Sequence, residues 1–495
     1  MTEHDHSTTI GQLPEPTEST PVTPRALTRA VWLMWVASLG VLAAALGTGG
    51  AWEFGGVVAV DGLTVLLWVV VTFFSGIVHS YSRRYMAGSK DLTRFFTRVF
   101  GFTLAVMVLV AADHVALFGV AWLAMGLAMA SLIGYVDGWP QAQAAATLAR
   151  RYFLASTALL AVALGVLSWA TGETAVSEIV TAVDTVPTVP WVVAVVALVG
   201  AAMIQSALVP FHSWLLSSMT APTPASALMH AGFVNAGGVL LVRFAPVVTL
   251  DPTVMLGIAV VGATSALLGK LLKTVQTDIK RKLGCSTVGQ MGFMLLQAGL
   301  GFFGAAITHL ILHGFYKAYQ FLSSGEQVEQ TAPAKTGTAA DPSAVGLIVT
   351  AVTAVAGGAL FAVLTGKGTS FDTGLLLAGL VSLTTLHATR TAVGHRGLPT
   401  TVRYVVAPLV FLAGITVYAG AYTAVTAVLA PLPLGSPPTE LTAVHGVLAA
   451  AFALAYVAVD TGVYERSTRL YVALVNAAQP AAGTLLTDTE DYNEY

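Results

Sequence analysis

Apolar segments of membrane-spanning length recur along the whole chain. A helix needs about 20 apolar residues to cross a bilayer, and the stretches after Arg29, Trp191 and Ala344 supply them without an intervening charge. Only 10% of the residues are charged and 56% are hydrophobic, whereas soluble domains carry about 25% charged residues. The sequence therefore predicts an all-α, multi-pass protein of the cell membrane.

The apolar segments predict about fourteen transmembrane helices. Two of the turns between them, near Asp113 and near Gly304, are very short. Residues 1–27 are expected to form a polar tail without a signal-peptide pattern, residues 28–460 the transmembrane domain, and residues 461–495 a second tail. The expected spans begin near Arg29, Asp61, Phe95, His114, Ala144, Trp191, Ala225, Thr253, Gly284, Ala305, Ala344, Thr373, Tyr404 and Thr442.

Basic and acidic residues fall on opposite sides of the membrane in this arrangement of spans. If the N-terminus is cytoplasmic, all but three of the 23 Lys and Arg residues fall in cytoplasmic loops or at their edges, as the positive-inside rule requires. Acidic residues such as Glu53, Glu173 and Asp251 fall on the other side. Both termini are therefore expected in the cytoplasm.

The three exceptions are Arg243, Lys317 and Lys367. Arg243 and Lys367 fall near the outer ends of their spans, where a long side chain such as that of Arg243 can reach the interface. Lys317 falls within a span. Because a charge inside the bilayer costs at least ~2.5–3.5 kcal/mol, such a residue usually faces a polar cavity. Lys317 is therefore a functional candidate.

Two histidines precede Lys317 at helical spacing. In THLILHGFYKAYQFL, His309, His313 and Lys317 recur every four residues, which places them on one helix face about 6 Å apart per turn. Imidazole changes charge near neutral pH, so the three groups could relay protons. One alternative is buried histidines bonded to backbone carbonyls. Another is a metal site, but no third ligand is evident and Lys317 would repel the cation, so we expect neither metal nor cofactor.

A proline-rich run interrupts another apolar span. The stretch from Leu208 reads LVPFHSWLLSSMTAPTPASALMHAGFVNAGG. Pro210 removes a backbone hydrogen bond and predicts a broken helix, a feature that lines ion paths in transporters. The alternative is a kinked structural helix with a satisfied histidine. The residues expected beside the break or the path are Gln205, Pro210, His212 and His230.

Several kinds of site are absent from the sequence. Cys285 is the single cysteine, which excludes an internal disulfide and argues against a cysteine-based zinc site or an iron–sulfur cluster held by this chain. There is no Walker motif, and no GxGxxG opens a helix after a strand. These absences argue against a nucleotide-driven pump.

Four long stretches resemble a known family. They are YMAGSKDLTRFF, VQTDIKRKLGCSTVGQMGFMLLQAGL and THLILHGFYKAYQFL, together with the run 210–243. They resemble the antiporter-like proton-conducting membrane subunits of respiratory complex I, Mrp-type cation/proton antiporters and the inorganic carbon accumulation system called DAB. The resemblance covers about residues 60–370. It implies two inverted five-helix repeats within about residues 95–390, each with a broken helix. It also implies ion-path roles for His230, Asp278, Lys280, His309, His313, Lys317 and Lys367.

Three positions depart from the family pattern. Leu123 follows Trp122 where the family has a glutamate, and Gln205 stands where the lysine partner of that glutamate is expected. Leu154 replaces an expected aspartate. The first half therefore lacks the Glu–Lys pair that respiratory pumps use.

The amino-acid sequences of the proline-rich run and of RLYVALVN are most similar to those of membrane subunits of the DAB system. This resemblance implies that the chain is not an enzyme. It would conduct H⁺ or Na⁺ and energise CO2/bicarbonate uptake with a cytoplasmic zinc partner similar to a β-carbonic anhydrase. The alternatives are a proton-translocating subunit of a quinone-linked dehydrogenase or Mrp-type antiporter, and a structural membrane scaffold.

Overall fold

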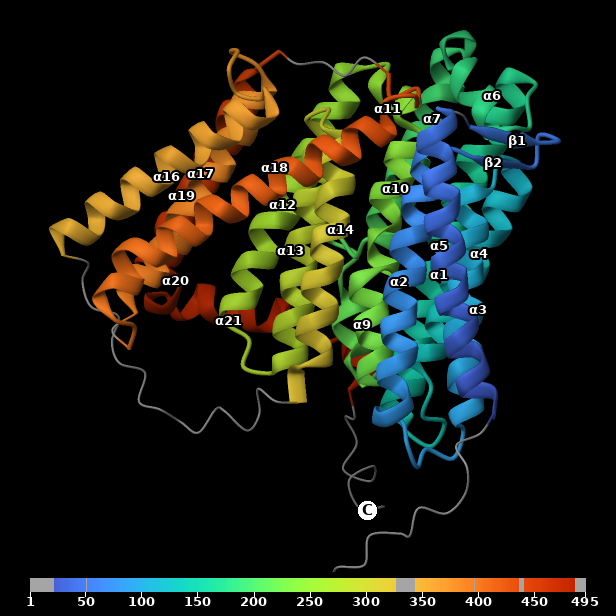
Figure 1. Cartoon of the computed structure of the whole chain (residues 1–495), viewed down its shortest axis with the longest axis horizontal. Coiled ribbons are helices and arrows are strands. Elements are labelled where there is room, and N and C mark those ends of the chain that lie inside the picture. The colour runs from blue at the N-terminus through green and yellow to red at the C-terminus, as the bar shows by residue number, and fades with distance from the viewer. Residues whose placement is uncertain (1–21, 50, 326–342, 396, 436–439, 486–495) are drawn as a thin grey trace, which may run out of the picture.

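The computed structural model describes residues 22–49, 51–325, 343–395, 397–435 and 440–485. Within them the chain is largely helical (Figure 1), and eleven helical segments are long and apolar enough to cross a membrane. The all-α, multi-pass class is confirmed. The eleven are α1 (Val22–Thr48), α2 (Gly62–Tyr85), α3 (Leu92–Ala111), α4 (Val115–Ile133), α5 (Pro140–Thr171), α7 (Thr188–Gln205), α9 with α10 (Thr223–Arg243), α12 (Pro252–Thr274), α16 (Ala344–Thr365), η4 with α18 (Val402–Leu429) and α19 (Ala443–Asp460).

Three further helices of 20 to 22 residues stand among them: α13 (Ile279–Gly299), α14 (Phe303–Leu322) and α17 (Thr373–Gly394). Every expected span position thus holds a helix in the described residues. Length and composition alone, however, place only eleven across the membrane, so the count of about fourteen stays a prediction. Most of the expected tail at 1–27, and the basic residues Lys335 and Arg396, lie outside the described residues.

Short elements join the long helices. Strands β1 (Trp52–Phe54) and β2 (Val58–Val60) form an antiparallel hairpin before α2. The remaining short elements are α6 (Val176–Thr181), η1 (Val183–Thr185), α8 (Ser213–Ser217), η2 (Ser218–Thr220), η3 (Phe233–Asn235), α11 (Ala245–Thr249), α20 (Val463–Arg466), α21 (Thr468–Ala477) and η5 (Ala482–Thr484).

The long helices form one bundle. Helices α1 to α5 and α7 lie on one side, α12, α13 and α14 in the middle, and α16 to α19 on the other side, tilted against the rest (Figure 1). Glycines bring α12 and α13 very close together. A Cβ on Gly292 would lie 2.7 Å from the carbonyl oxygen of Gly262, so only glycine allows this approach. The contact fixes the position of α13, on which much of the candidate site is built.

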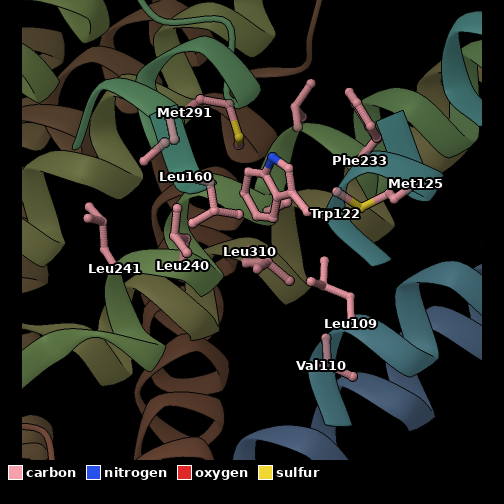
Figure 2. Packing of buried hydrophobic residues seen from close by; sticks show 14 of the residues in the cluster. Leu109, Val110, Trp122, Met125, Leu160, Phe233, Leu240, Leu241, Met291 and Leu310 are labelled. Carbon is pink, nitrogen blue, oxygen red and sulfur yellow. The ribbon is translucent and has the colours of Figure 1, made fainter. Parts of the chain in front are cut away.

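Aromatic and aliphatic side chains fill the N-terminal half of the bundle. Trp122 is buried beside Phe233 and Met125 (Figure 2). The rings of Phe153 and Phe233 lie 4.7 Å apart, and those of Phe153 and Trp214 4.8 Å apart, both nearly edge to face, an arrangement that adds to their burial energy. This core holds α4, α5, α8 and η3 together.

The C-terminal segment is folded rather than a simple tail. Helices α20 and α21 lie across one end of the bundle, roughly perpendicular to α12 and α13 (Figure 1). Beyond α21, the carbonyl of Ala478 accepts a hydrogen bond from Gln276 Nε2 at 3.2 Å, and the backbone N–H of Ala481 donates to Ser217 Oγ at 3.1 Å. Sequence reasoning placed no helix in 461–495, because α21 is only ten residues long, below the length that periodicity detects well.

Candidate functional site

Helix α7 ends inside the bundle at Gln205, and the chain turns through residues 206–212 before α8 begins at Ser213. The indole Nε1–H of Trp214 donates to the carbonyl of Ile204 at 2.9 Å. A helix end at membrane depth needs such a partner because lipid offers none. The predicted broken helix is therefore present. Its break nevertheless comes before Pro210, and Pro210 itself is exposed.

Two candidates beside this break face different surroundings. Gln205 is fully buried, and neither its amide oxygen nor its amide nitrogen has a hydrogen-bond partner among the described protein atoms. His212 instead reaches the C-terminal segment, where its Nε2–H donates to the carbonyl of Ala477 at 3.3 Å. The structure thus places Gln205 inside the bundle and His212 at its end.

A second break follows His230. Helix α9 ends at Ala231, and α10 begins at Ala236 after a short 3-10 turn. The side-chain N–H of Asn235 satisfies the carbonyl of Ala231 at 2.7 Å. His230 therefore lies in the last turn of a half-helix, fully buried. Sequence reasoning missed this break, although Gly232, Asn235 and the pair at 237–238 disfavour a continuous helix there.

The ring of His230 is held between α13 and α14. Its Nδ1 lies 2.9 Å from Thr287 Oγ1, and its ring stacks on Phe321 with centroids 4.3 Å apart. Thr287 Oγ1 also lies 3.0 Å from the carbonyl oxygen of Leu283, which can only accept. We therefore assign the hydroxyl proton to that carbonyl and the ring proton of His230 to Nδ1. His230 Nε2 has no partner among the described protein atoms, so its lone pair is free to accept a proton.

Lys317 reaches the same turn of α13. It is completely buried, and its Nζ donates to the carbonyl of Leu283 at 2.9 Å. That carbonyl thus receives both the Lys317 ammonium and the Thr287 hydroxyl. His230, Thr287, Lys317 and the Leu283 carbonyl form what we call the His230 cluster, contributed by α9, α13 and α14. Sequence reasoning missed Thr287 and Leu283, since neither a threonine nor a carbonyl stands out in an apolar helix.

His309 and His313 extend this cluster along α14. Their rings lie 5.8 Å apart and nearly parallel, and His313 is within electrostatic reach of Lys317 and His230. Neither nitrogen of His313, and not Nε2 of His309, has a partner among the described protein atoms. Backbone carbonyls therefore do not account for these nitrogens. His309 also lines a cavity of about 320 Å³ between α12, α13, α14, α17 and α19.

Asp278 and Lys280 lie at the start of α13. The Asp278 carboxylate accepts the backbone N–H of Arg281 at 2.7 Å and caps the helix. Lys280 Nζ donates to the carbonyl of Ala221 at 3.1 Å, next to the start of α9. Both residues therefore hold the ends of helices that carry the His230 cluster, rather than joining the cluster itself.

Lys367 lies apart from the other candidates. It follows α16, and its Nζ is 5.5 Å from the ring centre of Phe302, just before the first turn of α14. Lys317 is fourteen residues beyond Phe303, which corresponds to roughly 20 Å along the helix axis. The structure brings His230, His309, His313 and Lys317 together and leaves Lys367 near the opposite end of α14.

Arg243 forms an ion pair that sequence reasoning did not foresee. Its guanidinium contacts both carboxylate oxygens of Asp61 and donates to the carbonyl of Val110 at 3.0 Å. The two side chains are only 14% and 13% exposed. Asp61 also accepts the backbone N–H of Thr64 and caps α2. The pair ties the end of α10 to the start of α2, so Arg243 is not free to extend to the interface.

Comparison with known families matches the central part of this chain. Residues 112–340 match the family described as NADH:quinone oxidoreductase/Mrp antiporter, TM. Residues 51–96 match the N-terminal domain of NADH-ubiquinone oxidoreductase (complex I) chain 5. The two matches contain all the residues of the His230 cluster, together with His309 and His313.

Curated relatives include an inorganic carbon transporter subunit and a respiratory subunit. The probable inorganic carbon transporter subunit DabB1 of Halothiobacillus neapolitanus is 38% identical over 55% of this chain and 50% of its own length. NADH-quinone oxidoreductase subunit L of Mycobacterium tuberculosis is 36% identical over 54% of this chain and 42% of its own. The chain thus spans about half the length of the curated relatives it matches.

A solved structure extends the likeness to the fold. A subunit in the structure of the Mrp complex from Dietzia sp. DQ12-45-1b superposes over 96% of this chain and 52% of its own, with a TM-score of 0.56 and 24% sequence identity. Across the matched residues, the chain is similar in sequence to membrane subunits of inorganic carbon transporters and of NADH-quinone oxidoreductase, and over 96% of its length it is similar in fold to a chain of an Mrp complex.

Proposed function

We propose that this chain is a proton-conducting membrane subunit that energises CO2/bicarbonate uptake together with a cytoplasmic, DabA-like zinc partner. The observation that carries the proposal is the buried line from His309 through His313 and Lys317 to His230. Its titratable groups belong to α14 and α9, α13 supplies the Thr287 hydroxyl and the Leu283 carbonyl between them, and several of its nitrogens lack a partner among the described protein atoms. Buried polar groups of this kind normally bind ordered water, which would complete a hydrogen-bonded path.

The chemistry of the line favours H⁺ over Na⁺. A hard metal cation needs several oxygen ligands. The His230 cluster offers only the Thr287 hydroxyl and the Leu283 carbonyl, and both already make hydrogen bonds. The nearby Lys317 ammonium repels any metal cation. Protons need only donors and acceptors in series, and His230 Nε2 and the His313 nitrogens supply them.

The uptake role rests on similarity to DabB proteins, and the zinc partner is inferred from the resemblance of the proline-rich run and RLYVALVN to membrane subunits of the DAB system. On this proposal, CO2 hydration occurs in the partner, and proton flow through this chain makes it effectively one-way. Such coupling requires that a proton in the path change the relative stability of two states of the partner. The C-terminal segment is a suitable contact, since it bonds Ser217 and His212 beside the first break.

A second candidate is a proton-translocating subunit of a respiratory or Mrp-type complex. The likeness to subunit L and to the Mrp structure favours it. Against it stand Leu123 and Gln205 at the positions of the family's Glu–Lys pair. With an amide at the end of α7 instead of an ammonium, the position of Gln205 carries no charge that could respond to events in the second half.

The proton path is tested by Lys317→Met, which keeps the volume of the side chain and removes its charge. We expect proton flux in proteoliposomes, followed with an internal pH dye, to fall at least about tenfold. Lys282→Gln is the matched control, because Lys282 is an exposed lysine on the first turn of α13 and should leave the flux unchanged. Equal proton flux in the wild type and in Lys317→Met would contradict the proposed proton path through Lys317.

The partner is tested separately by gentle purification from native membranes with a zinc assay. Recovery of one large soluble zinc protein supports the carbon-uptake role. Recovery of several hydrophobic subunits with flavin or iron–sulfur proteins would instead support the respiratory candidate. Neither outcome depends on the flux measurement, so the two parts of the proposal can fail independently.

A further inference from the structure

The cavity of about 320 Å³ that reaches His309 has two distinct ends. Its inner wall is apolar and includes Leu267, Phe293, Leu380 and Phe452. Towards the C-terminal ends of α12 and α17, the same wall carries Lys270, Lys273 and His387. This is the end that the positive-inside pattern places in the cytoplasm. The cavity thus combines an apolar interior with a basic mouth.

The basic mouth lacks a compensating acid. No Asp or Glu lines the cavity, and neither Lys270 nor Lys273 has an ion pair within the described residues. Asp460, which follows the lining residue Val459, is already paired with Arg390 at 2.7 Å. Positive charge is therefore concentrated at a mouth that no carboxylate lines, an arrangement that attracts an anion.

Lys270 is positioned to bind such an anion. Its Nζ lies 3.2 Å from Nε2 of His387. Because an ammonium can only donate, His387 accepts this bond as a neutral ring, and two further N–H groups of Lys270 remain for a ligand. Ser286 and Gln290 on α13 and Tyr456 on α19 add polar groups to the same cavity.

We propose that this cavity binds one anionic phospholipid, with its phosphate at Lys270 and Lys273 and an acyl chain along the apolar wall. A free inorganic anion would use the lysines but leave the apolar wall in contact with water, which is unfavourable. Basic pockets between transmembrane helices on the cytoplasmic side are suited to acidic head groups. The site is independent of proton conduction, because it needs no titration of His309.

The test uses the full chain in nanodiscs of phosphatidylcholine containing rising fractions of dioleoyl phosphatidylglycerol. We expect phosphatidylglycerol to raise the unfolding temperature and to remain bound in native mass spectra. Lys270→Gln/Lys273→Gln should weaken this binding about 30-fold, the loss of two lysine–phosphate attractions. Lys270→Arg/Lys273→Arg should retain it, and Lys90→Gln, at an exposed loop lysine of the same end, should leave it unchanged.

A second variant tests the apolar wall of the cavity separately from the two lysines. Ala455→Trp fills space at the cavity wall without altering charge and should also reduce lipid binding. Inorganic phosphate added to phosphatidylcholine nanodiscs should not raise the unfolding temperature. Equal stability in both lipids for the wild type would overturn the proposal even if no variant could be purified. Protection by inorganic phosphate alone would overturn it in favour of a free-anion site.

Discussion

Lys317 and His230 are joined through a single turn of α13. The Leu283 carbonyl accepts the Lys317 ammonium at 2.9 Å and the Thr287 hydroxyl at 3.0 Å, and that hydroxyl lies 2.9 Å from His230 Nδ1. One neutral side chain therefore orients the histidine relative to the lysine. If conduction depends on this orientation, removing a single hydroxyl should disturb it without altering any charge.

Thr287→Val is the variant that removes this hydroxyl. It keeps the side-chain shape and leaves His230 Nδ1 without its partner, so we expect a loss of about 1–2 kcal/mol in stability and a clear fall in proton flux. Thr157→Val is the matched control, since Thr157 makes the same bond to a carbonyl four residues earlier, on α5. Equal flux in the two variants would argue against an orienting role for Thr287.

The Asp61–Arg243 pair should contribute strongly to stability. Asp61→Asn removes the negative charge that neutralises the largely buried Arg243 guanidinium, and we expect the free energy of unfolding to fall by about 3 kcal/mol. The pair Arg94–Asp137 offers a comparison, because its side chains are 33% and 65% exposed, and Asp137→Asn should change the unfolding temperature little. Thermal unfolding in detergent measures both, and similar shifts for the two variants would contradict the assigned difference.

Gln205 allows a test of water in the first half. Gln205→Leu replaces two unpartnered buried polar atoms with apolar ones, so we expect the stability to rise by about 1 kcal/mol. If the amide holds water in the path, flux should fall, though less than in Lys317→Met. Unchanged flux in a more stable protein would show that the first half does not carry protons past Gln205.

Close packing of α12 on α13 should tolerate no side chain at Gly292. A Cβ there would meet backbone atoms of Gly262 and Ala266, so Gly292→Val should separate the helices and lower the unfolding temperature by several degrees. Gly257→Val, at a glycine on α12 whose added Cβ would meet nothing, is the control. A shift of equal size in both would point to a general cost of valine rather than to helix contact.

The orientation of the chain can be measured directly. In a Cys285→Ala background, Lys90→Cys should react with an impermeant thiol reagent only from the cytoplasmic side, and Asp184→Cys only from outside. Both positions are exposed. Reaction of both from the same side would disprove the separation of charges on which the predicted topology rests.

Hydrophobicity, proline and histidine spacing were enough to predict the helical class, the broken helix before α8 and the shared face of His309, His313 and Lys317. These signals are local, as each depends on neighbours along one helix. The contacts between helices were not predictable in this way. Thr287 meets His230 across 57 positions of sequence, and Asp61 meets Arg243 across 182.

The placement of the C-terminal segment has a consequence for synthesis. Residues 477–484 lie beside the first helix break, where Ala477 bonds His212 and Thr484 bonds Ser217. More than 250 residues separate the partners in each bond. Because a chain emerges from the ribosome in order, this face of the break is left uncovered while all later helices insert. The first helix break is therefore covered only after all the later helices have been made and residues 477–484 have packed against it.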